Sequence, residues 1–275
     1  MQLVCGKKTL DLSRPRIMGI VNVTPDSFSD GGQYATISAA VTHSLQLIAE
    51  GADIIDIGGE STRPGAVPVE IKEEMARVIP VIRELKDCDA VISVDTRHAE
   101  VMLAALDAGA DMLNDVNAFQ GSGALEVALG SSAAVCLMHK QGEPSTMQQT
   151  IYFDDVVQDV YTFLQQRTAL LIAGGMGTER MLVDPGFGFG KTLQHNLQLL
   201  KHLDRLAELK LPVLVGLSRK SMLGKLTGRS VNEREAAGIA ANIHALQLGA
   251  RIFRVHDVAG FQDVLTVWQA IEDIQ

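Results

Sequence analysis

At 275 residues, the chain has the length of two ordinary domains or of one barrel-sized domain. It is 47% hydrophobic and 21% charged, which is ordinary for a globular core, and its formal net charge of −9 argues against a nucleic-acid partner. Cys5, Cys88 and Cys136 show neither a metal-ligand spacing nor a disulfide framework, as is usual in a reducing cytoplasm. The N-terminus lacks a signal peptide's apolar region and no run approaches a membrane span, so we expect a cytoplasmic protein with no membrane partner.

A hairpin is predicted at residues 2–13, and after it one unit repeats along the chain: an apolar strand, a polar motif, a loop and a helix. The predicted strands cover residues 16–21, 53–57, 90–94, 111–113, 134–137, 180–183, 212–217 and 251–253. The predicted helices cover residues 38–50, 71–85, 99–108, 156–173, 193–206, 232–248 and 261–274. Glycine follows several of these helices at the usual C-cap place, as at Gly51, Gly109 and Gly249.

The alternation of buried strands and helices predicts a parallel sheet. Eight such units in a chain of this length favour a single closed (β/α)8 barrel domain over residues 1–275, plugged or flanked by the short N-terminal β-hairpin. An open, doubly wound sheet is the alternative, but the even spacing of the units favours closure. The active site of such a barrel lies at the C-terminal ends of the strands, where every unusual motif of this chain falls.

The most distinctive motif is Asp184-Pro-Gly-Phe-Gly-Phe-Gly-Lys191, which follows a short apolar strand and precedes a helix. Its glycines allow the backbone to turn tightly and to approach a ligand closely. It is not a Walker loop, because Pro185 replaces the first glycine, and not a dinucleotide fingerprint, because Lys191 replaces the last. Asp184 could accept two N–H donors from a flat heterocycle; the alternative is a tight turn with a capping Asp184.

Other polar residues follow different strands and should converge with Asp184 in space. Asp95 and Asn114 end two further strands, and Lys220 comes just after another. Two carboxylates, an amide and an ammonium in one pocket could bind a ring that carries hydrogen-bond donors and acceptors along its edge. A strand-end cap explains each residue alone equally well, but it explains all of them together less well.

A basic cluster is predicted from Arg63, Arg219, Arg254 and His256. Arginine and histidine at helix starts, with backbone N–H groups, make an anion site suited to phosphate or pyrophosphate. Because strand residues alternate, Arg254 and His256 share a face, which points into the barrel mouth if Val255 packs outward. Two such polar residues need an anion or a carboxylate as a partner. The alternative is that Arg63 or Arg219 is solvated or paired with an acidic side chain.

The loops at residues 22–32 and 58–68 are long for this kind of barrel and contain glycine and proline. This composition is typical of mobile lids, which order when substrate binds. Surface loops without a role are the alternative.

These residues resemble a known family. The motifs Asn22-Val-Thr-Pro-Asp-Ser-Phe-Ser-Asp-Gly-Gly, Gly-Gly-Glu-Ser-Thr-Arg-Pro-Gly, Asp184-Pro-Gly-Phe-Gly-Phe-Gly-Lys and Ser218-Arg-Lys-Ser are similar to those of dihydropteroate synthase, in order over residues 16–257. The resemblance implies a (β/α)8 barrel and a transferase of folate biosynthesis. Such an enzyme joins 6-hydroxymethyl-7,8-dihydropterin pyrophosphate to p-aminobenzoate and releases pyrophosphate by a dissociative, SN1-like substitution, the step that sulfonamides block. It also implies Mg²⁺ as the cofactor and a homodimer.

The resemblance also implies a role for each matching position. The expected substrate-binding residues are Phe28, Thr62, Arg63, Pro64, Asp95, Asn114, Met138, Asp184, Phe189, Gly216, Ser218, Lys220, Arg254 and His256. The expected catalytic residues are Asp30, Asp95, Lys220, Arg254 and His256, and the expected Mg²⁺ contact is Asn22. Within this set, Asp95, Asn114, Asp184 and Lys220 would hold the pterin between the apolar walls of Met138 and Phe189. Thr62, Arg63, Pro64 and Ser218 would lie on the p-aminobenzoate side, under Phe28 and Asp30.

Two alternative functions remain at this point. Another pterin-binding barrel, such as a methyltetrahydrofolate methyltransferase domain, would share the pocket of carboxylates and amide but should lack Ser-Thr-Arg-Pro and Ser-Arg-Lys, both present here. A non-catalytic pterin-binding protein would show substitutions at Asn22, Lys220 or His256, and none is present.

Overall fold

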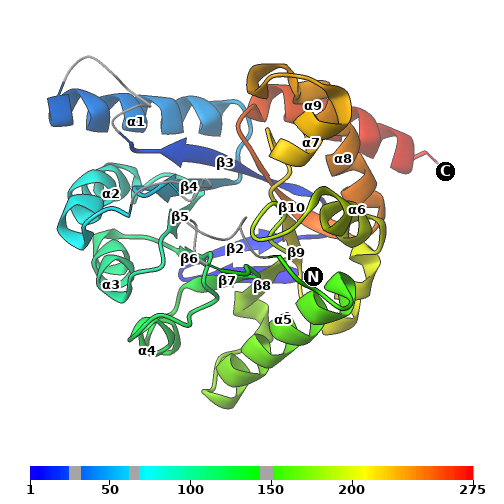
Figure 1. The fold of residues 1–275 in the computed structure, drawn as a ribbon. Helices are drawn as coiled ribbons and strands as arrows, with labels where there is room; N and C mark the ends of the chain where they lie inside the picture. Colours follow the sequence, from blue (N-terminus) through cyan, green and yellow to red (C-terminus); the bar gives the residue numbers. More distant parts are fainter. Residues whose placement is uncertain (25–31, 62–67, 143–150, 275) are drawn as a thin grey trace.

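A computed structural model describes residues 1–24, 32–61, 68–142 and 151–274 of the chain. Within them, eight parallel strands close into a barrel in the order β10-β3-β4-β5-β6-β7-β8-β9. Figure 1 shows helices as an outer ring around these strands. The strands are β3 (Arg16–Asn22), β4 (Ile54–Gly58), β5 (Val91–Asp95), β6 (Met112–Asp115), β7 (Ala134–Met138), β8 (Met181–Asp184), β9 (Val213–Val215) and β10 (Ala250–Val255). The prediction of a closed barrel is confirmed, and the open sheet is excluded by the pairing of β10 with both β3 and β9.

The helices are α1 (Gly32–Ala49), α2 (Ile71–Leu85), α3 (Ala99–Ala108), α4 (Ala124–Gly130), α5 (Val156–Ala173), α6 (Leu193–Lys201), α7 (Ser221–Thr227), α8 (Glu235–Gln247) and α9 (Val258–Glu272). Short 3-10 turns follow at η2 (Thr178–Arg180), η3 (Leu203–Leu209) and η4 (Val231–Glu233). Side-chain caps start several helices: Asp155 on α5, Thr192 on α6 and Asp257 on α9. In the described residues, no helix combines the length and the apolar character needed to cross a membrane.

Several helix boundaries differ from the prediction for local reasons. The helix predicted at residues 193–206 ends at Lys201 and continues as the 3-10 turn η3, and the one predicted at 232–248 begins only at Glu235, after η4. Helices α4 and α7 were not predicted, because each is short and contains or borders glycine. A Cβ at Gly224, inside α7, would meet the guanidinium of Arg234, the end of a flexible side chain that would then have to move.

The hairpin of β1 (Gln2–Cys5) and β2 (Lys8–Asp11) closes the N-terminal end of the barrel. Leu3 and Cys5 belong to one buried cluster with the inward-facing residues of the barrel strands, among them Met18, Met112 and Cys136. Figure 1 shows β2 behind the centre of the strand ring. The barrel interior is therefore apolar at this end.

The motif Gly-Ala-Asp occurs twice, and each copy binds the first residues of a neighbouring strand at the N-terminal end of the barrel. Asp53 accepts the backbone N–H of Ile17 at 2.9 Å and pairs with Arg16 at 2.8 Å. Asp111 accepts the backbone N–H of Ile92 at 2.9 Å and pairs with Lys8 of the hairpin at 2.9 Å. Each carboxylate thus accepts a backbone N–H group and forms an ion pair. We therefore interpret both Gly-Ala-Asp motifs as structural rather than catalytic.

Candidate active site

The residues at the C-terminal strand ends point into the barrel mouth together. Gly58, Asp95 and Asn114 are register partners across β4, β5 and β6, and Met138 and Asp184 are partners across β7 and β8. Neighbours in register on parallel strands direct their side chains to the same face. The structure therefore brings the predicted carboxylates and the amide to one end of the barrel, as their positions after the strands implied.

The centre of this site is Asp56 on β4, which the sequence analysis did not single out. Asp56 is fully buried. Its Oδ1 accepts from Ser93 Oγ at 2.6 Å, and its Oδ2 accepts from Asn114 Nδ2 at 3.1 Å and from Arg254 Nε at 2.7 Å. A signal was present in the sequence: an aspartate within an otherwise apolar strand must find partners inside the barrel.

Arg254 bridges two carboxylates in the barrel mouth. Besides its bond to Asp56, its Nη2 donates to Asp95 Oδ2 at 2.8 Å. Val255 is buried in the outer core, so Arg254 does point inward, and the partners it finds are carboxylates. Burial works against the charge of Arg254, but Asp56 and Asp95 raise its pKa overall. Burial raises the pKa of Asp95 to about 7, although Arg254 opposes the change.

Asp184 begins the glycine loop and anchors its first turn. It is 6% exposed, and its Oδ1 accepts the backbone N–H of Gly186 at 2.7 Å. Gly186 has φ +68°, and a Cβ at this position would collide with the His139 carbonyl oxygen, so only glycine fits. Burial raises the pKa of Asp184, while the Gly186 N–H and the charge of Lys220 oppose the rise.

Lys220 reaches the same pocket from the start of α7. Its Nζ lies 4.3 Å from the centroid of the Phe189 ring, a cation–π contact. Burial lowers the pKa of Lys220 to about 8, and Asp184 opposes that shift. Met138 is 4% exposed beside Asp184. An ammonium, a carboxylate, an aromatic ring and a thioether thus surround one space, which suits a flat polar ring.

The ends of β9 and β10 are joined by a side-chain hydrogen bond. Ser218 Oγ lies 3.0 Å from His256 Nδ1, so the ring of His256 is oriented from the neighbouring strand end. At the end of β9, Gly216 faces Arg254: a Cβ at this glycine would lie 3.9 Å from the Arg254 Cβ. The absence of a side chain leaves room for the guanidinium and for a ligand above it.

Asn22 is the last residue of β3 and is half-buried at the rim of the mouth, in register with Gly58. Mg²⁺ takes oxygen ligands, and it is commonly held by one or two protein groups together with substrate phosphates. The amide oxygen of Asn22 fits that coordination, provided that a pyrophosphate supplies further oxygens.

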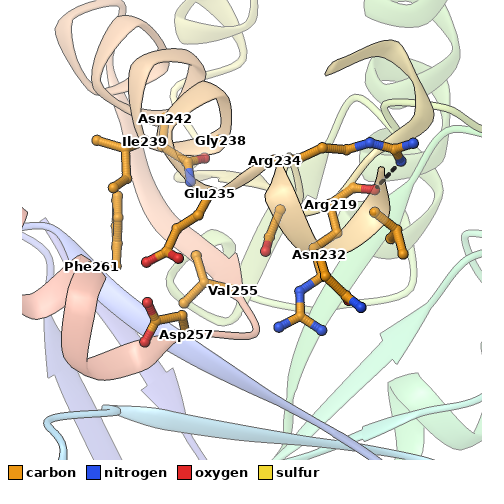
Figure 2. Close-up of a pocket in the computed structure, with 12 residues that line it drawn as sticks. Arg219, Asn232, Arg234, Glu235, Gly238, Ile239, Asn242, Val255, Asp257 and Phe261 are labelled. Atoms are coloured by element: carbon orange, nitrogen blue, oxygen red, sulfur yellow. Dashed lines mark hydrogen bonds between the residues drawn. The ribbon is translucent and has the colours of Figure 1, made fainter. Parts of the chain in front are cut away.

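Arg219, a member of the predicted basic cluster, lies next to acidic side chains. Arg219 is exposed, adopts φ +58°, and lines a cavity of about 50 Å³ together with Glu235 and Asp257. Figure 2 shows the two carboxylates facing one another and the Arg219 carbonyl accepting from Arg234, at 3.1 Å. The shared hydrogen bond raises the pKa of Glu235 and lowers that of Asp257. The charge of Arg219 lowers the pKa of both carboxyls slightly, and the expectation that Arg219 joins the anion site with Arg254 stays a prediction.

Some predicted site residues lie outside the described part of the chain. These are Phe28, Asp30, Thr62, Arg63 and Pro64, in the loops predicted to act as lids.

The fold and the polar pocket at its strand ends are those of a barrel enzyme. The family described as pterin binding enzyme matches residues 18–256. The Haemophilus influenzae dihydropteroate synthase is 49% identical over 271 residues, which are 98% of this chain and 98% of that protein. A Xanthomonas albilineans dihydropteroate synthase solved with 4-aminobenzoic acid matches with a TM-score of 0.94 and 51% identity, over 100% of this chain and 99% of that one. Another structure from that organism, with 7,8-dihydropteroate, matches with a TM-score of 0.91 and 49% identity, over 100% of both chains. The chain belongs to the dihydropteroate synthase family of pterin-binding enzymes.

Proposed function

We propose that the chain condenses 6-hydroxymethyl-7,8-dihydropterin pyrophosphate with p-aminobenzoate, forming dihydropteroate and releasing pyrophosphate. The observation that carries this function is the polar barrel mouth, in which Asp95, Asn114, Asp184 and Lys220 surround one space at the strand ends. Full-length relatives bearing this activity support it, and none of the relatives reported above is a methyltransferase or a non-catalytic binder.

Pterin recognition follows from the donors and acceptors in this mouth. The aminopyrimidinone edge of a pterin presents adjacent N–H donors, and an ionised Asp184 can accept both. Asp95 offers carboxyl oxygens as acceptors; burial raises its pKa, and the Arg254 guanidinium at 2.8 Å opposes the rise. Asn114 offers an amide whose Nδ2 is held by Asp56. The ring lies between Met138 and Phe189, with the Lys220 ammonium at its edge.

The reaction breaks the C–O bond between the pterin methylene carbon and pyrophosphate. Positive charge that develops on this carbon spreads into the conjugated ring, where Asp95 and Asp184 stabilise it. His256, oriented by Ser218, and the guanidinium of Arg254 lie on the pyrophosphate side and offset the charge of the leaving group. The amine of p-aminobenzoate is a neutral nucleophile and needs no strong general base; it gives up its proton after the C–N bond forms.

Mg²⁺ at Asn22 would supply charge neutralisation for the departing pyrophosphate. We further propose that the chain acts as one domain, forms a homodimer and works in the cytoplasm. Support for these proposals comes from the family resemblance and from the composition, which shows no disulfide framework.

The activity is tested by measuring pyrophosphate and dihydropteroate in the same reaction, with each substrate omitted in turn and with Mg²⁺ present or chelated. We expect equal amounts of both products, only when both substrates and Mg²⁺ are present. Asp184→Asn serves as the site control and should abolish the signal. Pyrophosphate release without p-aminobenzoate, or methyl transfer from methyltetrahydrofolate, would contradict the proposal.

A further inference from the structure

Lys191, the last residue of the glycine motif, has no task in the activity described above. It is 3% exposed, so its ammonium lies inside the protein. Nζ donates to the Gly186 carbonyl at 2.8 Å and to the Phe189 carbonyl at 3.2 Å, and it lies 2.9 Å from His139 Nδ1. A buried ammonium persists only when its donors are satisfied, and here they are used to hold loop backbone.

The carbonyls held by Lys191 belong to the turn that shapes the pterin pocket. The Gly186 N–H is bound by Asp184, and the Gly186 carbonyl accepts both the Phe189 N–H at 3.2 Å and the Lys191 ammonium at 2.8 Å. The ring of Phe189 in turn lies against Lys220 Nζ. Displacing the ammonium would therefore release the segment that orients both a carboxylate and an aromatic wall.

A second side chain holds the same loop from helix α6. Asn196 is 2% exposed; its Oδ1 accepts the Gly188 N–H at 2.7 Å, and its Nδ2 donates to the Lys191 carbonyl at 3.2 Å and to the Thr192 carbonyl at 2.7 Å. Glycines at three positions of positive φ would otherwise leave this loop with many accessible conformations. The structure thus fixes a glycine-rich loop through buried side chains behind it.

The same ammonium acts on Asp184 through its charge. Lys191, Lys220 and Arg254 each lower the pKa of Asp184, against the dominant effect of burial, which raises it. Burial lowers the pKa of Lys191 to about 7, although Asp184 opposes the shift, so Lys191 is an ammonium at acidic pH. Burial, reinforced by the charge of Lys191, lowers the pKa of His139 to about 2 and keeps this ring neutral. Cys136, whose pKa is also affected by Asp184, is a neutral thiol because burial raises its pKa.

We propose that Lys191 is a positioning residue of the pterin site: it fixes the turn of residues 186–189 and, by its charge, keeps Asp184 ionised for the pterin. The proposal rests on the proposed function, because it assumes that Asp184 receives the pterin donors. It assigns Lys191 no contact with either substrate.

The two parts of the proposal make separable predictions. Loss of the ammonium's hydrogen bonds should weaken pterin binding, with no matching effect on p-aminobenzoate. Loss of its charge removes one of the cations that lower the pKa of Asp184, so Asp184 protonates at a higher pH. Because a protonated Asp184 cannot accept both ring donors, pterin binding should then be lost at a higher pH as the solution is acidified.

The test is calorimetric titration of 6-hydroxymethyl-7,8-dihydropterin pyrophosphate with Mg²⁺ into the full chain, over a series of acidic to neutral pH values. Lys191→Met keeps the apolar stem and loses donors and charge, whereas Lys191→Gln loses the charge and keeps two N–H donors on a shorter side chain. Lys201→Met, at an exposed position at the end of helix α6, which follows the loop, is the matched control. Steady-state KM values for both substrates and a thermal melt accompany each variant.

We expect Lys191→Met to bind the pterin about tenfold or more weakly, with the KM of p-aminobenzoate unchanged. Both Lys191 variants should lose binding at a higher pH than the native chain, and Lys201→Met should match the native chain throughout. If Lys191→Met fails to fold, the pH profile of Lys191→Gln decides. A profile unchanged from that of the native chain in a folded Lys191 variant would overturn the proposal. A native chain that does not bind the pterin would instead reject the proposed function.

Discussion

Asp56→Ala is the substitution most informative about how the site is built. Asp56 is fully buried and accepts from Ser93, Asn114 and Arg254. The Ser93 hydroxyl can rotate towards another acceptor. The amide of Asn114 and the Nε of Arg254 both donate to Asp56 from inside the barrel mouth. Truncation therefore leaves two buried donors without an acceptor and removes one of the carboxylates that pair with Arg254.

The loss in the free energy of unfolding follows from this geometry. Breaking a buried ion pair by removing one partner destabilises by about 3–5 kcal/mol. At about 2–4 °C per kcal/mol for a chain of this size, the melting temperature should fall by about 6–20 °C. Because Arg254 and Asn114 lose their orientation, kcat/KM should also fall about a hundredfold. Asp56→Asn keeps an oxygen for Arg254 and should cost less, about 1–3 kcal/mol.

The assay combines urea unfolding of each variant with the pyrophosphate-release rate at 25 °C. Asp107→Ala, at an exposed position on α3, is the control and should stay within about 0.5 kcal/mol of the native chain. If Asp56→Ala were as stable and as active as Asp107→Ala, the description of Asp56 as the organising carboxylate of the site would be refuted.

Further predictions concern individual contacts of the site. Lys220→Met should remove turnover while leaving the melting temperature within a few degrees, because the methionine stem preserves the packing. In the native chain, turnover should fall as the pH rises through about 8, where the Lys220 ammonium is lost. A pH profile that stays flat would exclude a catalytic role for this ammonium. Ser218→Ala removes the hydroxyl that orients His256 and should lower kcat about 2- to 10-fold with unchanged stability, whereas an unaltered kcat would show that the hydrogen bond at 3.0 Å has no catalytic consequence. Chelation of Mg²⁺ should stop pyrophosphate release, and Asn22→Ala should raise the Mg²⁺ concentration needed for half-maximal rate; equal Mg²⁺ dependence in the two proteins would remove Asn22 from the metal site.

Most of the barrel could be predicted from the sequence, because its units of strand, loop and helix are regular. Residues 71–85, 99–108 and 156–173 are helices with the predicted bounds, since apolar periodicity and a following glycine or polar cap act locally. The short helices α4 and α7 were not predicted, because tertiary packing stabilises them although each contains a glycine. Gly224 lies against the guanidinium of Arg234, ten residues away, a contact that no local pattern reveals.

The site was less predictable than the fold because its contacts join distant strands. Position after a strand identified Asp95, Asn114 and Asp184 as neighbours, and the register of the strands agrees. The partner of Arg254 could not be predicted in the same way, because it is Asp56, 198 residues earlier in the chain. The roles of the individual substrate-binding and catalytic residues stay predictions, for which the experiments above provide the tests.

The central claim is that the glycine loop presents Asp184 to the pterin. It is tested most directly by titrating 6-hydroxymethyl-7,8-dihydropterin pyrophosphate, at neutral pH and with Mg²⁺, into the native chain and into Asp184→Asn. The amide loses the charge and one acceptor while the ring donors stay buried, a loss of about 1–3 kcal/mol, so affinity should fall about 5- to 150-fold. Equal pterin affinity in the two proteins, with both folded, would contradict the account.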